Sequence, residues 1–274
     1  MTQTKIRHLI QVIAEMKSVL VSFSGGIDST LLLETALRAL GPEKVLAVTA
    51  ASETYPREEL EEAKHLAETL GARHLLISTG ELKNERFFEN PPERCYYCKQ
   101  ELFGELSKIA RSYNLEYVID GANADDAGDF RPGLRAGAEH GVRSPLRETG
   151  ITKVEIRSIA KARRLPNWDK PSMPCLSSRF PYGHTITSEK LHQVDEAERF
   201  LRSLGLDELR VRHHGDTARI EVPEVMIKKV ASPTIRKKVT AKLKSLGFNY
   251  ITLDLNGFRS GSMNEVLSKE ILNG

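Results

Sequence analysis

Short apolar runs alternate with helical patterns along the first half of the chain. The runs are Val19–Phe23, Val45–Ala50, His74–Ser78 and Tyr117–Asp120. Between them, helical patterns cover Asp28–Leu40, the stretch from Pro56 to Gly71, and Cys98–Tyr113. Strands that alternate with helices pair in parallel and form an open sheet covered on both faces. The pattern therefore predicts an α/β domain of the nucleotide-binding type.

The pattern changes after a capping-box spacing at Thr152 and Glu155, which starts a helix that Pro166 ends. Residues 166–187 hold four prolines and no usable periodicity, and such a long loop is more often functional than idle. Beyond it come a helix over Ser188–Leu204, a hairpin across Gly215-Asp216, a helix after Pro233 and the strand YITLDL. We expect three parts: an ATP-binding domain over 1–166, an active-site loop over 167–187, and a smaller α+β domain for substrate binding or oligomerisation over 188–274.

The stretch SFSGGIDST, Ser22 to Thr30, joins the first predicted strand to the first predicted helix. Its glycines lack a Cβ, so a ligand can approach the backbone, and the N–H groups of a helix start attract anions. A tight connection capped by a serine is the alternative. A Walker-type phosphate loop requires a lysine, which this loop lacks, and the G-x-G-x-x-G fingerprint of dinucleotide-binding proteins is also absent from it. The string resembles the SGGxDS signature of the PP-loop ATP pyrophosphatases, which implies ATP binding and AMP transfer.

That resemblance implies a set of nucleotide-binding positions. The second strand ends in AVTAASE, where the superfamily holds adenine, and the fourth runs into DGANADDAGD, residues 120–129. Ligands bind beyond the carboxyl ends of parallel strands, so this acidic loop is expected to face the glycine turn. The expected ATP-binding residues are Ser22, Ser24, Gly25, Gly26, Asp28, Ser29, Thr30, Ala50 and Gly121, with Asp28 also catalytic. Asp28 with Asp125 or Asp126 is expected to hold Mg²⁺; a solvated acidic turn is the alternative for each.

Three cysteines stand at uneven spacing: Cys95 and Cys98 in RCYYCK, and Cys175 in the proline-rich loop. An odd number argues against a disulfide framework and for metal or redox chemistry. A lone C-x-x-C is equally a zinc half-site or a redox pair, and a zinc site would need further ligands such as His140, His184 or His192. Three thiolates also suit an iron–sulfur cluster with one iron open to an outside ligand.

Four longer stretches carry a more specific resemblance: DGANADDAGDFRPGLRAGAEHGVRSPL, CLSSRFPYG, RVRHHGDTARIE and YITLDLNGFRSGSMN. They resemble the LarE family of ATP-dependent sulfur transferases in nickel-pincer cofactor synthesis. The resemblance implies adenylation of a pyridinium biscarboxylate mononucleotide and its conversion to a thiocarboxylate. Some members sacrifice the sulfur of the single cysteine in CxSSRFPYG; others have three cysteines and are thought to use a [4Fe–4S] cluster. This chain matches the second kind, with Cys95, Cys98 and catalytic Cys175 as expected ligands, and sacrifice of Cys175 is the alternative.

An anionic substrate calls for guanidinium and hydroxyl partners. Arg210 and Arg212 lie two apart on a predicted strand, so they share one face with His214. Without the family, such a strand is more often a solvated outer face. The expected substrate contacts are Ser177, Ser178, Arg179, Arg210, Arg212 and Arg259.

Charge and apolar content narrow the setting. The formal net charge is +3, which permits an anionic ligand but does not demand nucleic acid. The sequence has no stretch that resembles a signal peptide or a membrane span, so we expect a cytoplasmic protein without membrane partners. The family also implies a homo-oligomer, while the upstream sulfur donor stays open. The rival interpretations are a tRNA-thiolating PP-loop enzyme, an amidotransferase-like ligase, and a nucleotide-binding regulator without catalysis.

Overall fold

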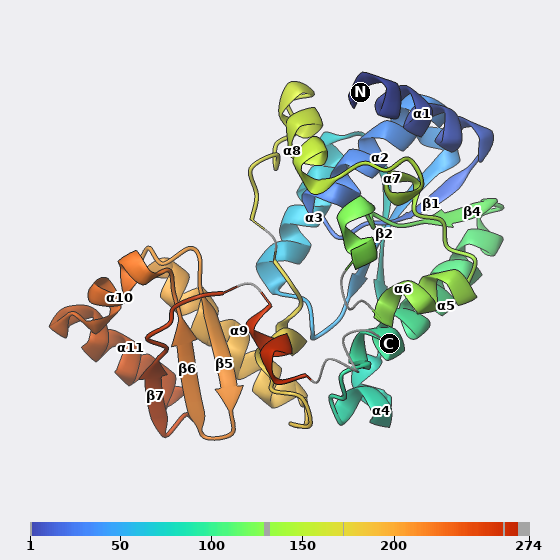
Figure 1. Cartoon of the computed structure of the whole chain (residues 1–274). Helices are drawn as coiled ribbons and strands as arrows, with labels where there is room; N and C mark the ends of the chain where they lie inside the picture. Colours follow the sequence, from blue (N-terminus) through green and yellow to red (C-terminus); the bar gives the residue numbers. More distant parts are fainter. Residues whose placement is uncertain (1, 129–131, 172, 260, 268–274) are drawn as a thin grey trace. The chain divides into compact units, whose positions relative to one another are not determined.

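A computed structural model describes residues 2–128, 132–171, 173–259 and 261–267 (Figure 1). The chain divides into two compact units. Unit 1 comprises Met1–Glu81 and Glu93–Met173; unit 2 comprises Leu82–Pro92 and Pro174–Gly274. Position 129, the end of the acidic stretch expected at the nucleotide, lies outside the described residues.

Unit 1 is the predicted parallel α/β fold. Its strands are β1 (Val19–Ser22), β2 (Val45–Ala51), β3 (Arg73–Ser78) and β4 (Tyr117–Ile119). They pair in parallel in the order β3-β2-β1-β4. The helices are α1 (Thr2–Glu15), α2 (Ile27–Leu40), α3 (Arg57–Thr69), α5 (Arg94–Ser112), α6 (Pro132–Glu139), α7 (Pro145–Glu148) and α8 (Lys153–Ala162). The α/β expectation is confirmed, whereas α1, α6 and α7 were not predicted.

Side chains of β1 alternate between the two faces of this sheet. Val19 and Val21 enter the core that α1, α2, α3 and α8 build, while Leu20 enters the core under α5 and α6. Because helices cover both faces, the strands are apolar on both sides, which is why they appear in the sequence as unbroken apolar runs. In open parallel sheets ligands bind beyond the carboxyl ends of the strands, so the loops that follow β1 and β4 are where a binding site is expected.

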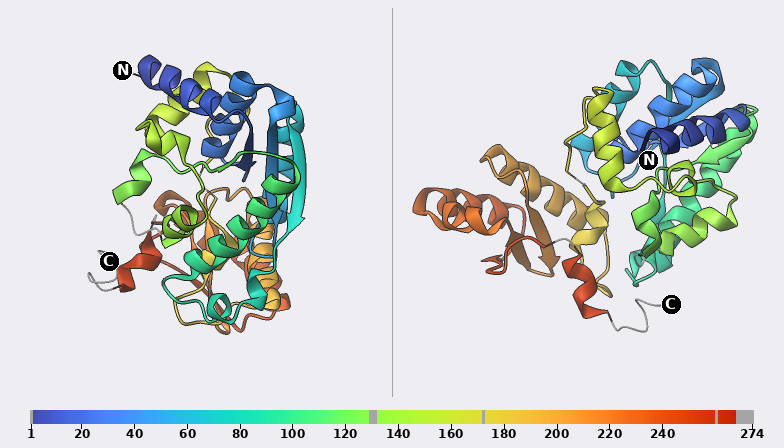
Figure 2. Two further views of the ribbon diagram at one scale, coloured as in Figure 1. Left: turned by 90° about the vertical axis from the view of Figure 1, so that its right-hand side faces the viewer. Right: turned by 45° about the horizontal axis from the view of Figure 1, so that its top comes forward.

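Unit 2 is built on a three-stranded sheet in the order β5-β6-β7. The strands β5 (Arg210–His214) and β6 (Thr217–Glu221) form the predicted antiparallel hairpin, and β7 (Tyr250–Leu253) pairs in parallel with β6. The helices are α4 (Glu85–Phe88), α9 (Ser188–Ser203), α10 (Glu224–Ala231) and α11 (Pro233–Ser245). The last two lie side by side and contribute Val230, Val239 and Leu243 to one apolar core (Figure 2).

Residues 82–92 belong with unit 2, although the sequence placed them in the first domain. The side chain of Asn90 donates to the carbonyls of Phe180 (3.3 Å) and Pro181 (2.7 Å), and the backbone N–H of Gly183 donates to Asn90 (2.9 Å). Asn90 is fully buried with φ of 55°, a conformation that asparagine adopts more readily than most residues. Hydrogen bonds between residues about 90 positions apart leave no local pattern in the sequence. The sequence therefore contains no sign that residues 82–92 belong to unit 2.

Two boundaries of the proline-rich region also differ from expectation. Helix α8 ends at Ala162 rather than near Pro166, and the change of unit falls between Met173 and Pro174. The predicted capping box is present: the Thr152 hydroxyl accepts from the N–H of Glu155, whose carboxylate accepts from the N–H of Thr152. No helix among the described residues is long and apolar enough to cross a membrane.

Candidate functional site

The glycine turn between β1 and α2 is built as a cradle of hydroxyl and backbone groups. The Oγ atoms of Ser24 and Ser29 lie 3.2 Å apart. Ser29 Oγ donates to the Gly26 carbonyl at 3.0 Å, and the Gly26 N–H donates to Ser24 Oγ at 3.4 Å. Helix α2 starts at Ile27, directly after the turn. The N–H groups and positive end of this helix suit phosphate oxygens.

Two glycines are required by close backbone approach. Gly25 has φ of 66°, and a Cβ there would lie 2.9 Å from the Cβ of Ala63 on α3. A Cβ on Gly121, just beyond β4, would lie 3.0 Å from the backbone N of Ser29. Of the expected ATP-binding residues, Gly25 therefore packs against α3 and Gly121 against the first turn of α2. Their glycine identity follows from packing whether or not a ligand is bound.

Two residues that the sequence analysis missed hold the turn from outside. Asn167 is buried, and its Nδ2 donates to the Gly25 carbonyl and to Thr30 Oγ1, each at 2.9 Å. The hydroxyl of Tyr55 donates to the Ser24 carbonyl, and the pKa of Tyr55 is raised by burial and then by Glu59. Asn167 lies in the proline-rich stretch, which is the one signal that pointed to it.

A lysine that the sequence analysis did not select pairs with Asp28. Lys153 Nζ lies 2.5 Å from Asp28 Oδ2, and the backbone N–H of Lys153 donates to Asp125 at 2.8 Å. A second ammonium, on Lys170, lies 2.8 Å from Glu59. These side chains line one cavity, whose wall consists of Ser24, Gly26, Ile27, Asp28, Tyr55, Glu59, Lys153, Lys170, Pro171 and Met173. The cavity thus places two ammonium groups beside a helix start, each paired with a carboxylate that lines the same cavity.

The remaining ATP and magnesium positions lie near the carboxyl ends of β1, β2 and β4. Ala50 pairs with Ile77 and is partly exposed. Its neighbour Thr49 is buried: the Thr49 hydroxyl donates to the Phe23 carbonyl and lies 2.9 Å from His74 Nε2. Burial lowers the pKa of His74, and Lys64 lowers it further. Contact between Ala50 and adenine stays a prediction.

Asp125 and Asp126 already have backbone partners. Asp126 is buried and accepts from the N–H of Asn123 at 2.9 Å, and Asp125 caps the start of α8 at Lys153. Within either unit, the described residues gather no group of three His, Cys, Asp or Glu side chains able to hold a metal ion. Ligation of Mg²⁺ by these aspartates stays a prediction, and triphosphate oxygens would have to supply most ligands.

Cys95 and Cys98 lie in the first turn of α5, which begins at Arg94 instead of near Cys98 as predicted. Three residues apart on a helix, the two thiols share one face. Cys95 is exposed and Cys98 partly exposed, and Cys98 Sγ donates to Glu81 Oε1 at 3.7 Å. Burial raises the pKa of Glu81. Cysteine thiolates suit iron or another thiophilic metal as ligands, and unit 1 supplies two of the three thiols expected at the cluster.

Cys175 lies in unit 2, immediately before a 3₁₀ turn over Leu176–Arg179. Its thiol is free and partly exposed, and its carbonyl accepts from the N–H of Ser178 at 3.0 Å. Ser177 is fully buried, whereas Ser178 is partly exposed. Of the two serines expected at the substrate, Ser178 is the one with accessible surface.

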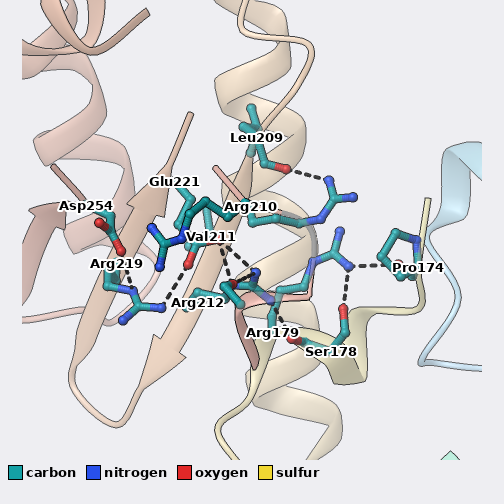
Figure 3. A network of polar contacts seen from close by, with 12 residues as sticks. Pro174, Ser178, Arg179, Leu209, Arg210, Val211, Arg212, Arg219, Glu221 and Asp254 are labelled. Atoms are coloured by element: carbon teal, nitrogen blue, oxygen red, sulfur yellow. Dashed lines mark hydrogen bonds and ion pairs between the residues drawn. The ribbon is translucent and has the colours of Figure 1, made fainter. Parts of the chain in front are cut away.

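The arginines of unit 2 form a buried network rather than a solvated strand face (Figure 3). Arg210 and Arg212 do share a face of β5, as predicted, but only 5% and 4% of them is exposed. Arg212 is bonded to Glu221 (2.8 Å) on β6, diagonally across the hairpin, because Glu221 lies opposite Arg210. The Arg210 guanidinium lies 5.0 Å from the Phe258 ring centroid, and burial followed by Arg179 lowers the pKa of Arg210 to about 10.

The two other predicted substrate arginines fare differently. Arg179 is fully buried and bonded to Glu198, so it has no surface to offer a substrate and the prediction for it is corrected. The sequence could not reveal this because Glu198 lies on a separate helix. Arg259 is partly exposed and pairs with Glu265 at 3.1 Å. Arg259 thus remains a candidate for substrate contact, whereas the burial of Arg210 and Arg212 leaves their side chains little surface for one.

Comparison with known proteins adds the family. The NAD synthase family model matches residues 2–90. A pyridinium-3,5-bisthiocarboxylic acid mononucleotide synthase of Lactiplantibacillus plantarum is 44% identical over 97% of this chain and 96% of its own. An uncharacterised protein of Synechocystis sp. is 44% identical over 98% of this chain and 100% of its own. An NH₃-dependent NAD⁺ synthetase of Hyperthermus butylicus is 48% identical over 62 residues, 22% of each chain. Because the similarity to the synthase runs from end to end, the chain belongs to the LarE family of PP-loop enzymes.

Proposed function

We propose that the chain is an ATP-dependent sulfur transferase acting on pyridinium-3,5-biscarboxylic acid mononucleotide in nickel-pincer cofactor synthesis. The observation that carries the proposal is the cradle of Ser24, Gly26 and Ser29 at the start of α2, with Lys153 and Asp28 beside it. The 44% identity to a synthase of the bisthiocarboxylic acid mononucleotide supports the substrate class.

The first step is adenylation of a substrate carboxylate. The carboxylate oxygen attacks the α-phosphorus of ATP, and pyrophosphate leaves. The turn N–H groups and Lys153 would hold the departing phosphates, since donors aimed at developing negative charge stabilise the transition state. Asn167 and Tyr55 keep the turn in shape during the step because they bond its carbonyls. A carboxylate is a poor acyl donor, and attaching AMP turns one of its oxygens into part of a good leaving group.

The second step is displacement of AMP by sulfur. Cys175 takes part in it under two alternative routes. In the route that the number of cysteines favours, Cys95, Cys98 and Cys175 would hold a [4Fe–4S] cluster, and Asp28 with Asp125 or Asp126 would help to hold Mg²⁺. When bound, the cluster would supply an iron-held sulfide and the magnesium would neutralise phosphate charge. In the alternative route, Cys175 attacks the acyl-adenylate and gives up its own sulfur, which leaves dehydroalanine.

Anaerobically purified protein tests the proposal. Incubated with ATP and the biscarboxylate mononucleotide, it is expected to release AMP and pyrophosphate only with the acid acceptor and to form the thiocarboxylate. Iron and acid-labile sulfide analysis then separates the routes, because a colourless protein that loses one H₂S per turnover supports sacrifice. AMP release that depends on RNA, or no turnover with any acceptor, contradicts the proposal.

We include self-association in the proposal, as the family resemblance implies. Light scattering on the purified chain would measure it. A monomer at all concentrations would remove this part of the proposal without affecting the chemistry.

A further inference from the structure

A fully buried guanidinium holds the backbone on both sides of Cys175. Arg179 Nη1 donates to the Pro174 carbonyl at 2.7 Å, to the Cys175 carbonyl at 3.1 Å and to Ser178 Oγ at 2.9 Å. The Pro174 carbonyl precedes the Cα of Cys175 and the Cys175 carbonyl follows it. One group therefore restrains both peptide units that aim the thiol (Figure 3).

Glu198 on α9 fixes this guanidinium in turn. Arg179 Nε and Nη2 each donate to one carboxylate oxygen at 2.9 Å, the side-on geometry with two parallel bonds. The same carboxylate accepts from the N–H of Val211 on β5 and from Arg202 on α9, both at 2.9 Å. Burial raises the pKa of Glu198, but Arg179 and the Val211 N–H more than offset it and lower that pKa below its ordinary range. The carboxylate thus stays ionised and ties the turn to a helix and a strand.

A second buried pair holds the far end of the same turn. Arg212 Nη1 donates to the Ser178 carbonyl at 2.7 Å, while its Nε and Nη2 bond Glu221. The turn is therefore restrained at its start by Arg179 and at its end by Arg212. Fixed geometry at two points matters for a thiol that must meet a reactive carbonyl or an iron atom at one distance and angle.

Stability alone is a poor reason for such a pair. Desolvating two charges offsets most of their attraction, and well-packed apolar residues often stabilise as much. Arg179 is also 0% exposed, which removes direct contact with substrate as its role. What an apolar side chain could not do is donate hydrogen bonds to the Pro174 and Cys175 carbonyls.

We propose that Arg179, held by Glu198, is a positioning residue that aims Cys175 for the sulfur-transfer step. The inference rests on the proposed function for the step it serves, but the geometry of the turn can be tested separately. The groups proposed to bind ATP for adenylation all belong to unit 1, whereas the bonds of Arg179 lie within unit 2, so AMP formation should depend on Arg179 less than sulfur transfer does. Loss of Arg179 should therefore uncouple AMP formation from thiocarboxylate formation.

The key variant is the full-length double substitution Arg179→Met/Glu198→Gln. It removes both charges together, so no unpaired charge is left buried, and the glutamine oxygen can still accept from the Val211 N–H. Arg179→Lys is the single variant beside it. Arg202→Met is the matched control, because Arg202 donates to the same carboxylate but none of its described bonds reaches the turn. Thermal unfolding checks that each variant is folded.

Two readouts are compared. With ATP and the mononucleotide, the double variant is expected to keep AMP formation while thiocarboxylate formation falls about 10- to 100-fold, the scale of a small misplacement. In a Cys95→Ser/Cys98→Ser background, Cys175 is the only thiol, and mass spectrometry follows its alkylation by iodoacetamide. Release of the turn should raise that rate several-fold in both Arg179 variants and not in Arg202→Met.

The outcomes separate the two proposals. If the folded double variant forms thiocarboxylate at the rate of the unsubstituted chain, or if the rate of Cys175 alkylation is unchanged, the positioning role is overturned. If the unsubstituted chain makes no thiocarboxylate, the proposed function fails, and the alkylation rates still decide whether Arg179 controls the turn.

Discussion

The two reactive turns of this molecule are held by different physical means. The glycine turn of unit 1 is shaped by close backbone packing and by neutral donors, the amide of Asn167 and the hydroxyl of Tyr55. The Cys175 turn of unit 2 is held by buried guanidinium groups paired with Glu198 and Glu221. The ion pair beside the glycine turn, Lys153 with Asp28, is partly exposed at the cavity proposed to receive ATP. The ion pair behind the Cys175 turn, Arg179 with Glu198, is buried.

Replacing Cys175 separates the two turns most completely. Cys175→Ala should abolish thiocarboxylate formation under either sulfur route, because both need the thiol, and it should spare AMP release. Quantifying AMP and thiocarboxylate in the same reaction measures this. Cys95→Ala is the companion: it stops transfer under the cluster route and leaves it intact under sacrifice. Loss of AMP release in Cys175→Ala would show that its role has been misplaced.

The packing of the glycine turn predicts the next largest effect. Gly25→Ala combines a positive φ with a Cβ only 2.9 Å from Ala63, so it should lower the free energy of unfolding by about 2–4 kcal/mol and eliminate ATP binding. Gly71→Ala also has a positive φ, 67°, close to that of Gly25, but meets nothing within 4 Å, so it should cost only about 1–2 kcal/mol. Denaturant unfolding and calorimetric ATP titration provide the measurements. Equal losses would refute the steric argument.

Lys153 tests whether unit 1 depends on a charge at its cavity. Lys153→Ala should slow pyrophosphate release about 10- to 100-fold, because a donor to the phosphates is lost and Asp28 no longer faces its cation. The double variant Lys153→Ala/Asp28→Asn should be less than additive, since the two side chains act as a pair. Lys161→Ala, an exposed lysine on the same helix, is the control. Full activity in Lys153→Ala would remove this lysine from the site.

The smallest effect concerns pH and unit 2. Burial, followed by Lys190, lowers the pKa of His213 to about 4. The unfolded chain, with an ordinary histidine pKa near 6.5, then binds more protons than the folded chain between these values. The free energy of unfolding should therefore fall by about 2 kcal/mol as pH drops from 7 to 5. In His213→Asn that part of the loss should disappear, which urea unfolding at the two pH values would detect.

Local signals predicted much of the framework and the glycine turn. Apolar runs located all four strands of unit 1, and the string Ser24–Thr30 marked the turn because its requirement for small residues is a property of adjacent positions. Helix α1 was missed although its sequence carried the signal: Ile6, Leu9, Ile10 and Ile13 recur at helical spacing, and Leu9 and Ile13 are buried in the core.

The partners of the turns could not be predicted, for a physical reason. Asn167 lies 142 residues from Gly25 and Lys153 lies 125 residues from Asp28, so neither pair has a spacing rule. Arg179 was predicted at the substrate because arginine suits anions, but the anion it meets is Glu198 of the same chain. The type of a residue tells which groups its side chain can bind, whereas the fold determines which of those groups lies beside it.

Because residues 82–92 belong to unit 2, the order of synthesis limits when unit 2 can fold. Phe87 and Asn90 emerge from the ribosome long before Pro174–Gly274, the segment with which they are grouped. A buried aromatic ring and a buried amide must therefore wait for partners while the sheet of unit 1 is already assembling. During that interval Phe87 and Asn90 lack the segment with which they are grouped in the folded chain.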